Sequence, residues 1–275
     1  MMRNILCHAF KNISYRVWKW MERASSVRNP SMAKTAPYWG MQLRETTLTD
    51  YVVLRLLEKC GNFIDVFTFP SEIEAQIGAD MELWLTDHSG KWLGLRIQCK
   101  IMGPNGEFQQ LHHKIRNRNV YQWEALIDSS ARHPRCLPIY LLYVGPYPVR
   151  SGSISYPHYR IYMRYNRRGN WWISAYRIKQ LRPKQNIMNL WPHMHPWECM
   201  VCCPSFVYIS VNDVLNVLKN TVFQGDNEAQ NVEIADSPPR YVQLAREGRL
   251  PDSVDELRSL LEGREMRHLI IMSLG

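Results

Sequence analysis

The sequence lacks any apolar run that approaches the roughly 18 residues of a membrane-spanning helix. Its 275 residues also lack a paired set of cysteines, because there are seven and most of them stand among apolar residues. This cysteine usage favours a reducing compartment over a disulfide framework. The first 40 residues contain no continuous apolar segment of the kind found in secretory signals. We therefore expect a cytoplasmic protein without a transmembrane span.

Acidic residues are absent from residues 129–197, a stretch that carries eleven Lys and Arg within a chain of net charge +9. Residues 42–128 have the opposite balance, with twelve acidic and nine basic residues. Tyr and Trp are interleaved with the basic residues of the positive stretch. This combination suits nucleic acid, since Lys and Arg contact phosphates and aromatic rings stack on unpaired bases; a solvated basic surface is the alternative. The side chains that we expect to contact phosphates are Arg164, Arg167, Arg168, Arg177 and Lys179.

Apolar periodicity predicts a mixed α/β fold. The segment Glu45–Cys60 repeats apolar residues at helical spacing and is followed by Gly61, a residue that often ends helices. Short runs typical of strands and one further helical pattern come after it. In chain order we predict a strand at 62–69, strands at 81–85 and 93–101, a helix at 120–132 and a strand at 137–144. The elements therefore follow the order α-β-β-β-α-β.

Three segments of different character divide the chain. Residues 1–41 are basic and only partly amphipathic, and we expect a disordered tail or an extension upstream of the working start. Residues 42–145 form the predicted core. Residues 146–275 form a basic, aromatic-rich extension that packs on this core. The extension is predicted to contain a strand at 171–175, helices at 211–221, 240–247 and 253–262, and a final strand at 268–274 that extends the central sheet.

Pairing of the two strands that flank the Asp-His-Ser-Gly turn at 87–90 brings three polar residues together. Asp80 precedes the first strand. Gln98 and Lys100 lie two apart on the second strand, so their side chains share a face. A carboxylate, an amide oxygen and an ammonium group at one end of a hairpin suit a hard divalent cation and the water that it activates.

This pattern, Asp followed by Gln-x-Lys at the end of a hairpin, resembles the motif of the PD-(D/E)XK nuclease superfamily. It is most similar to Mrr-type restriction endonucleases, in which Gln often replaces the middle acid. The strings GADMELWL and LGLRIQCK also resemble an uncharacterised bacterial family within that superfamily. The matching elements span residues 45–145, and their order is that of the superfamily core. The resemblance implies a restriction-endonuclease-like fold with a mixed central sheet, and a hydrolase that uses Mg²⁺ or Mn²⁺ to cleave nucleic acid, with DNA favoured over RNA.

The resemblance also assigns a role to each residue of the motif. Asp80 and the side-chain oxygen of Gln98 would hold the metal ion, with the backbone carbonyl of Cys99 as a further ligand. Lys100 would orient or help to deprotonate the attacking water and would offset phosphate charge. The motif therefore predicts a metal-dependent endonuclease.

Each candidate residue has an ordinary structural interpretation as well. Glu45 and Glu74 are candidates for an additional carboxylate, because the resembled superfamily supplies one from its first helix. An acid in a first helical turn also complements the helix dipole, and this explains Glu45 equally well. Asp80 and Lys100 are of types common at strand ends. Gln98 is the informative residue, since a buried amide without a partner is costly and a cation would satisfy it.

Two other functions stay open. The chain could be a nucleic-acid-binding protein of the same fold with an inactive site, or a protein-interaction domain whose basic stretch meets an acidic partner. A homodimer is compatible with each of them. The H-x-H-x3-C-x2-C spacing of His193, His195, Cys199 and Cys202 looks like a set of zinc ligands. The segment equally suits a buried apolar strand, so we do not expect a structural zinc.

Overall fold

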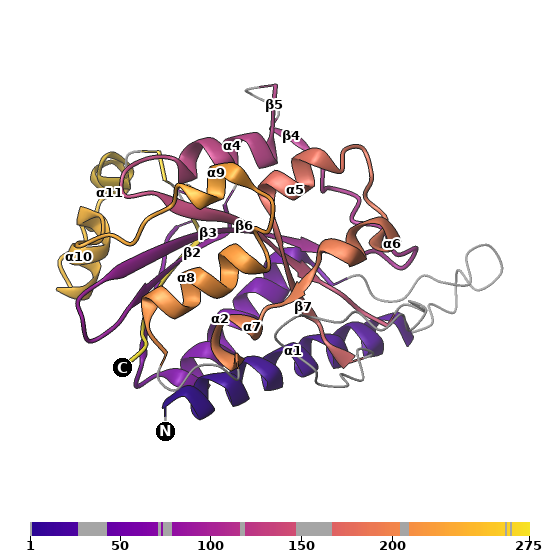
Figure 1. The fold of residues 1–275 in the computed structure, drawn as a ribbon, viewed down its shortest axis with the longest axis horizontal. Coiled ribbons are helices and arrows are strands. Elements are labelled where there is room, and N and C mark those ends of the chain that lie inside the picture. The colour runs from indigo at the N-terminus through magenta and orange to yellow at the C-terminus, as the bar shows by residue number, and fades with distance from the viewer. Residues whose placement is uncertain are drawn as a thin grey trace.

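The computed structural model describes residues 2–26, 43–70, 73, 79–115, 119–146, 167–203, 209–261, 263–264 and 266–275. They form a mixed α/β fold, as the sequence predicts, with helices on both faces of one large sheet (Figure 1). No helix in these ranges is long and apolar enough to cross a membrane. The elements in chain order are α1 (Met2–Ser26), α2 (Glu45–Cys60), β1 (Ile64–Thr68), β2 (Met81–Thr86), β3 (Trp92–Ile101), β4 (Lys114–Ile115), β5 (Val120–Tyr121), α4 (Gln122–Ser130), β6 (Cys136–Tyr143), β7 (Asn170–Ser174), α5 (Ala175–Gln180), α6 (Ile187–Leu190), the 3-10 helix η2 (Trp191–His193), β8 (His195–Pro196), α7 (Cys199–Cys202), α8 (Val211–Asn220), α9 (Asn227–Gln230), α10 (Arg240–Arg246), α11 (Val254–Leu261) and β9 (His268–Ser273).

Within the described residues the central sheet has seven strands in the order β1-β9-β2-β3-β6-β7-β8. Strands β2 and β3 form the predicted antiparallel hairpin, and β6 lies parallel to β3. The last strand of the chain joins the central sheet, as the sequence predicts. Strand β9 lies inside it, antiparallel to β1 and parallel to β2. An internal strand is covered on both faces and is therefore apolar along its whole length. This describes β9, in which Leu269, Ile270, Ile271 and Met272 are at most 2% exposed.

Alternate side chains of the hairpin enter two apolar cores. Leu83 and Leu95 belong to the larger core, which includes buried residues of α1, α2 and α8. Trp84 belongs to the second core, together with Tyr241 of α10 and Leu257 of α11. The predicted core segment and the predicted extension therefore contribute strands to the same sheet and helices to the same packing.

The second core also contains a buried cluster of charged side chains. Glu82 pairs with Arg96 at 3.3 Å and with Arg264 at 3.7 Å, and it accepts hydrogen bonds from Trp84 at 3.1 Å and from Tyr241. All five side chains are buried. Buried charges are costly unless they are paired and hydrogen-bonded, as these are. The cluster therefore fixes the chain around Arg264, just before β9, against the hairpin.

The N-terminal segment is a packed helix, and the expectation of a disordered tail is wrong for residues 2–26. Leu6, Phe10, Ile13 and Val17 are at most 1% exposed, and their spacing places them along one side of α1. The helix lies against α2, α7 and β7. Burial of these side chains outweighs the basic and polar character of the rest of the segment, which on its own indicates a tail.

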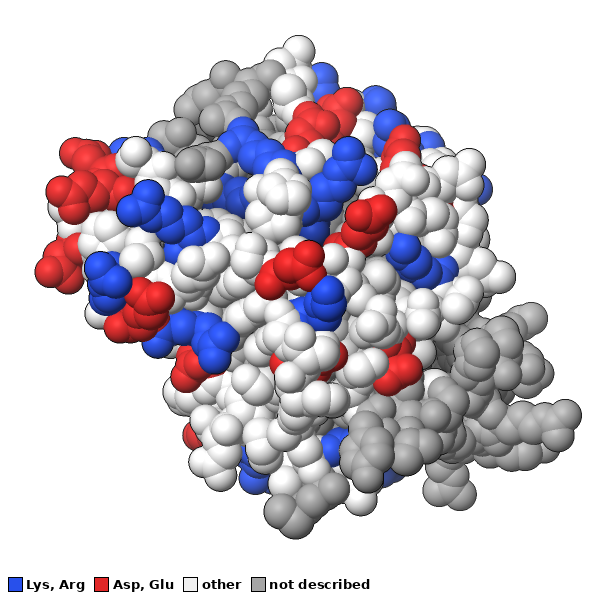
Figure 2. Space-filling view, turned by 60° about the vertical axis from the view of Figure 1, so that its left-hand side comes forward, with Lys and Arg blue, Asp and Glu red and all other residues white. Residues whose placement is uncertain are grey.

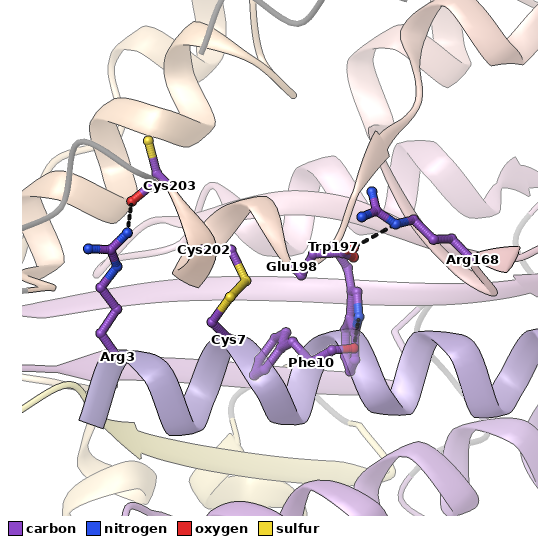
Figure 3. Close-up of a disulfide and its surroundings, with 8 residues drawn as sticks. All are labelled: Arg3, Cys7, Phe10, Arg168, Trp197, Glu198, Cys202 and Cys203. Atoms are coloured by element: carbon purple, nitrogen blue, oxygen red, sulfur yellow. Dashed lines mark hydrogen bonds and ion pairs between the residues drawn. A yellow bond between two sulfur atoms is a disulfide. The ribbon is translucent and has the colours of Figure 1, made fainter. Parts of the chain in front are cut away.

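A disulfide between Cys7 and Cys202 joins α1 to α7 (Figure 3). Beside it, the indole nitrogen of Trp197 donates a hydrogen bond to the carbonyl of Phe10 at 2.9 Å, and the two rings have centroids 4.4 Å apart. The expectation of a chain without disulfides is therefore wrong for this pair. The two cysteines are 195 residues apart in the sequence, and they meet only because α1 is part of the fold.

Substitution Cys202→Ser is expected to lower the free energy of unfolding by about 3–5 kcal/mol under oxidising conditions, because the cross-link closes a very long loop in the unfolded chain. Chemical denaturation of the variant and the wild type measures the difference. Reduction of the wild type should reproduce the loss, and it should leave Cys202→Ser unchanged. Cys60→Ser, at a buried free cysteine, controls for the loss of a buried sulfur. Equal stability of the oxidised and reduced wild type would contradict a stabilising role for the bond.

Candidate active site

The open end of the β2–β3 hairpin brings Asp80 and Gln98 into contact. Met81 pairs with Ile97, and the backbone N–H of Asp80 donates to the Ile97 carbonyl at 2.9 Å, so Asp80 lies beside Gln98. Oδ2 of Asp80 accepts hydrogen bonds from the Gln98 side-chain amide and from the backbone N–H of Cys99, each at 2.5 Å. The predicted convergence of Asp80 and Gln98 at this end of the hairpin is confirmed.

Glu45, the first residue of α2, reaches the same point. Lys100 Nζ lies 3.1 Å from Glu45 Oε1 and 3.5 Å from Oε2. The Gln98 amide nitrogen lies 3.5 Å from Oε1 of the same carboxylate. The unpaired N–H groups of a first helical turn favour an ionised acid there. The structure thus brings Glu45, Asp80, Gln98 and Lys100 together from a helix and a hairpin.

Three oxygen atoms surround the side-chain amide nitrogen of Gln98. Nε2 lies 2.5 Å from Asp80 Oδ2, 3.1 Å from the carbonyl oxygen of Cys99 and 3.5 Å from Glu45 Oε1. The amide oxygen of Gln98 is buried and has no hydrogen-bond partner in the described part of the chain. A half-turn about the last side-chain bond exchanges the two amide atoms. The residue can therefore present either a donor or a fourth oxygen to the same point.

This set of oxygen atoms fits Mg²⁺ or Mn²⁺. Both cations take carboxylate, amide and peptide oxygens, and Glu45, Asp80, the Cys99 carbonyl and the rotated Gln98 amide supply them. A divalent cation at this point would also be attracted by the charges of both carboxylates. No group of three or more His, Cys, Asp or Glu side chains that could hold a metal ion occurs within the described ranges. The amide and the peptide carbonyl are therefore essential to the fit.

The candidate site is largely covered, and Glu45 is its most exposed member. The Glu45 side chain is 22% exposed and that of Lys100 only 4%. Gln98 is 2% exposed and Asp80 9%. Lys100 is therefore not the solvated strand-end lysine of its ordinary interpretation. A buried ammonium group needs a charged partner, and Glu45 supplies it.

A chain of hydrogen bonds holds the first turn of α2 against β3 and β6. The Thr49 hydroxyl donates to the carbonyl of Glu45 at 3.0 Å and lies 3.1 Å from the Tyr143 hydroxyl, which in turn donates to Cys99 Sγ at 3.4 Å. Burial raises the pKa values of Tyr143 and Cys99 well above those usual for a phenol and a thiol, and the charge of Asp80 raises both further. Both groups are therefore neutral, and their hydrogen bonds hold Glu45 and Cys99 in place.

A second supporting group comes from the first residue of β9 and the residue before it, and sequence analysis did not identify it. The backbone N–H groups of Arg267 and His268 both donate to the carbonyl of Asp80 at 3.1 Å. Their side chains pair with Asp50 of α2, Arg267 at 2.7 and 2.9 Å and His268 at 2.9 Å. These contacts tie Asp80 to the helix that carries Glu45. The sequence signal was an Arg-His pair before an apolar strand, and it becomes meaningful only once β9 lies beside β2.

Two of the predicted phosphate contacts are engaged within the protein. Arg168 pairs with Glu198 at 2.9 Å, and the Glu198 side chain is 3% exposed. Arg177 donates to the carbonyl of Gln224 at 3.1 Å and lies 4.0 Å from a carboxylate oxygen of Asp226. Breaking a pair with a buried carboxylate is costly. The structure therefore gives Arg168 in particular a structural role that the sequence did not indicate.

Strand β7 divides the predicted basic set between two places. Residues 167–168 precede it and residues 177–179 follow it, and a five-residue strand spans about 17 Å. Lys100 pairs with Leu142, which pairs with Trp171 near the start of β7. The start of β7 therefore lies at the same end of the sheet as the candidate site, and its far end lies away from it.

Surface charge is mixed where it can be seen. Figure 2 shows basic and acidic side chains interspersed on the side of the molecule where α10 and α11 lie. At the end of the sheet that holds the candidate site, Arg167 is exposed, and its guanidinium carbon is 6.0 Å from the centre of the Trp18 ring. Lys179, beyond the far end of β7, is exposed 5.9 Å from the Trp123 ring. Arg164 lies outside the residues that the structure describes.

The remaining predicted site residues are Glu74 and the zinc-like set of histidines and cysteines. Glu74 is outside the described residues. Cys202, one of the zinc-like set, is bonded to Cys7. Burial lowers the pKa of His195 to about 4 and raises that of Cys199 well above its usual value. This segment is therefore packed into the core and held to α1.

Comparison of the chain with curated proteins and with solved structures gave no significant match. Residues 6–274 match DUF6615, which is described as a family of unknown function. The matched region begins within the second turn of α1 and ends just after β9, so it contains most of the packed N-terminal helix, the hairpin and all four site residues. The chain belongs to the family DUF6615.

Proposed function

We propose that this protein is a Mg²⁺- or Mn²⁺-dependent nuclease that hydrolyses phosphodiester bonds of DNA. The observation that supports it most is the meeting of Glu45, Asp80, Gln98 and Lys100 at one end of the sheet. The succession of α2, β1, β2, β3, α4 and β6, with β6 parallel to β3, supports a restriction-endonuclease-like core. A cytoplasmic location with access to DNA belongs to the same proposal.

In this proposal each group has one task. Glu45, Asp80 and the Cys99 carbonyl supply oxygen atoms for the cation, and Gln98 adds another after rotation of its amide. A bound divalent cation would polarise the phosphate and lower the pKa of water. Lys100 orients the attacking water and offsets the charge that develops on the phosphate. The hydrogen bonds of Thr49 and Tyr143 keep Glu45 and Cys99 in position.

Purified protein is expected to cleave plasmid DNA or a single-stranded oligonucleotide with Mg²⁺ or Mn²⁺, and EDTA should stop the reaction. Asp80→Ala should abolish cleavage and weaken Mn²⁺ binding by about tenfold or more, because it removes a charged ligand. Gel analysis of the products and calorimetry with Mn²⁺ measure the two effects. Asp65→Ala, at an exposed acid on β1, is the control and should leave both unchanged. Absence of cleavage and of Mn²⁺ binding in the wild type would contradict the proposal.

A nucleic-acid-binding protein with an inactive site is the second candidate, and one observation favours it. The amide nitrogen of Gln98 faces both carboxylates, and in this orientation it satisfies Asp80 and Glu45 without a cation. The same measurements separate the two candidates. Wild-type protein that binds DNA but neither cleaves it nor binds Mn²⁺ is the result expected of the second.

A further inference from the structure

Tyr140 has a buried hydroxyl group that takes no part in the proposed metal binding or hydrolysis. The residue lies on β6 and pairs with Gln98 on β3. Paired residues of neighbouring strands direct their side chains to the same face of a sheet. Tyr140 is 0% exposed, and its hydroxyl oxygen has no hydrogen-bond partner among the described residues. Buried hydroxyl groups are nearly always paired, so this one needs an explanation.

The phenol lies within the electrostatic reach of the candidate site. Burial raises the pKa of Tyr140 well above its usual value, and the charges of Asp80 and Glu45 raise it further. A tyrosine hydroxyl is ordinarily protonated at neutral pH, so this one can donate a hydrogen bond to an acceptor that enters the site. Neither carboxylate accepts that hydrogen bond in the structure.

Tyr143, three residues further along the same strand, provides a direct comparison. Both tyrosines are 0% exposed. The hydroxyl of Tyr143 is paired, at 3.1 Å from Thr49 Oγ1 and 3.4 Å from Cys99 Sγ. Tyr143 therefore supports α2, whereas the hydroxyl of Tyr140 has no corresponding structural contact.

We propose that Tyr140 is a ligand-binding residue of the candidate site, whose hydroxyl donates a hydrogen bond to an oxygen atom of the bound ligand. The inference rests on the proposed function, which supplies the chemistry of that ligand. The Gln98 amide oxygen and the Tyr140 hydroxyl are two buried, unpaired polar atoms on adjacent strands. A ligand with polar oxygen atoms would satisfy such groups. Two sources have them, the water held by a divalent cation and the phosphate group of DNA.

Stability without ligand is the first part of the test. Tyr140→Phe in EDTA is expected to unfold at the wild-type temperature or a few degrees above it, because it removes an unpaired hydroxyl and keeps the ring. Tyr143→Phe should unfold at a lower temperature, because it breaks two contacts. Thermal unfolding of both variants measures the contrast. A lower unfolding temperature for Tyr140→Phe than for the wild type would overturn the proposal, since it would reveal a structural partner.

For ligand binding, Tyr140→Phe should be the more damaging of the two substitutions. Tyr140→Phe is expected to weaken binding about five- to tenfold, the effect of one lost hydrogen bond, and Tyr143→Phe should weaken it less. Calorimetry with Mn²⁺ alone and DNA binding in Ca²⁺ are the two arms. Weaker Mn²⁺ binding assigns the acceptor to the water of the cation, and weaker DNA binding alone assigns it to a phosphate oxygen. Wild-type affinity in both arms would overturn the proposal.

Both arms measure binding and not cleavage. Wild-type protein that binds Mn²⁺ and DNA but cleaves nothing would contradict the nuclease function alone, and the comparison of Tyr140→Phe with Tyr143→Phe would still decide the role of Tyr140.

Discussion

Deletion of residues 1–26 is expected to abolish the cooperative unfolding transition. The deletion removes Leu6, Phe10, Ile13 and Val17, each at most 1% exposed, and exposes the apolar surface that they cover. Full burial of one such side chain contributes about 1.5–3 kcal/mol. Together the four are comparable with the roughly 5–15 kcal/mol by which a folded domain is stable. The deletion also removes one half of the disulfide that joins α1 to α7.

Circular dichroism during heating measures this effect. Two point variants separate the contribution of the buried face of α1 from that of its exposed face. Phe10→Ala is expected to cost about 3–5 kcal/mol, since it leaves a cavity between α1 and the rest of the core. Lys11→Ala, at the next and exposed position, should change stability by less than about 0.5 kcal/mol. A truncated protein that melts cooperatively near the wild-type temperature would show that the segment is dispensable.

The elements around the candidate site could be predicted from the sequence alone. The helix predicted at Glu45–Cys60 has the same bounds as α2, and the two hairpin strands each differ from β2 and β3 by one residue at one end. These segments combine strong periodicity with clear ends, at Gly61 and at a turn in which Gly90 has a φ of 74°. Strand parity was then sufficient to place Asp80 beside Gln98.

What the sequence could not show depends on contacts between distant segments. No local pattern indicates that β9 enters the sheet between β1 and β2, so the support of Asp80 by Arg267 and His268 was not predictable. Helix α1 carried a signal, the helical repeat of apolar residues from Leu6 to Val17. Its burial depends on α7 and β7, which come from a distant part of the chain. The ion pair of Lys100 with Glu45 likewise depends on the position of α2 and not on its own strand.

Substitution Lys100→Met is expected to abolish cleavage and to preserve cation binding. The variant keeps an unbranched, buried side chain and removes the ammonium group that lies 3.1 Å from Glu45. Without that fixed positive charge, Mn²⁺ should bind as tightly as in the wild type or up to about tenfold more tightly. Loss of the group that orients water and offsets phosphate charge should lower the cleavage rate by about 10²–10⁴-fold.

Glu45→Gln is the matched variant, because it removes the other half of the same ion pair. Both substitutions break that pair, so a fall in unfolding temperature common to both measures its structural contribution. Their effects on Mn²⁺ affinity should differ in sign, since Glu45 is a proposed ligand and Lys100 a competing charge. Equal weakening of Mn²⁺ binding by both would show that Lys100 acts only through the fold. Cleavage at the wild-type rate by Lys100→Met would place the reaction centre away from this hairpin.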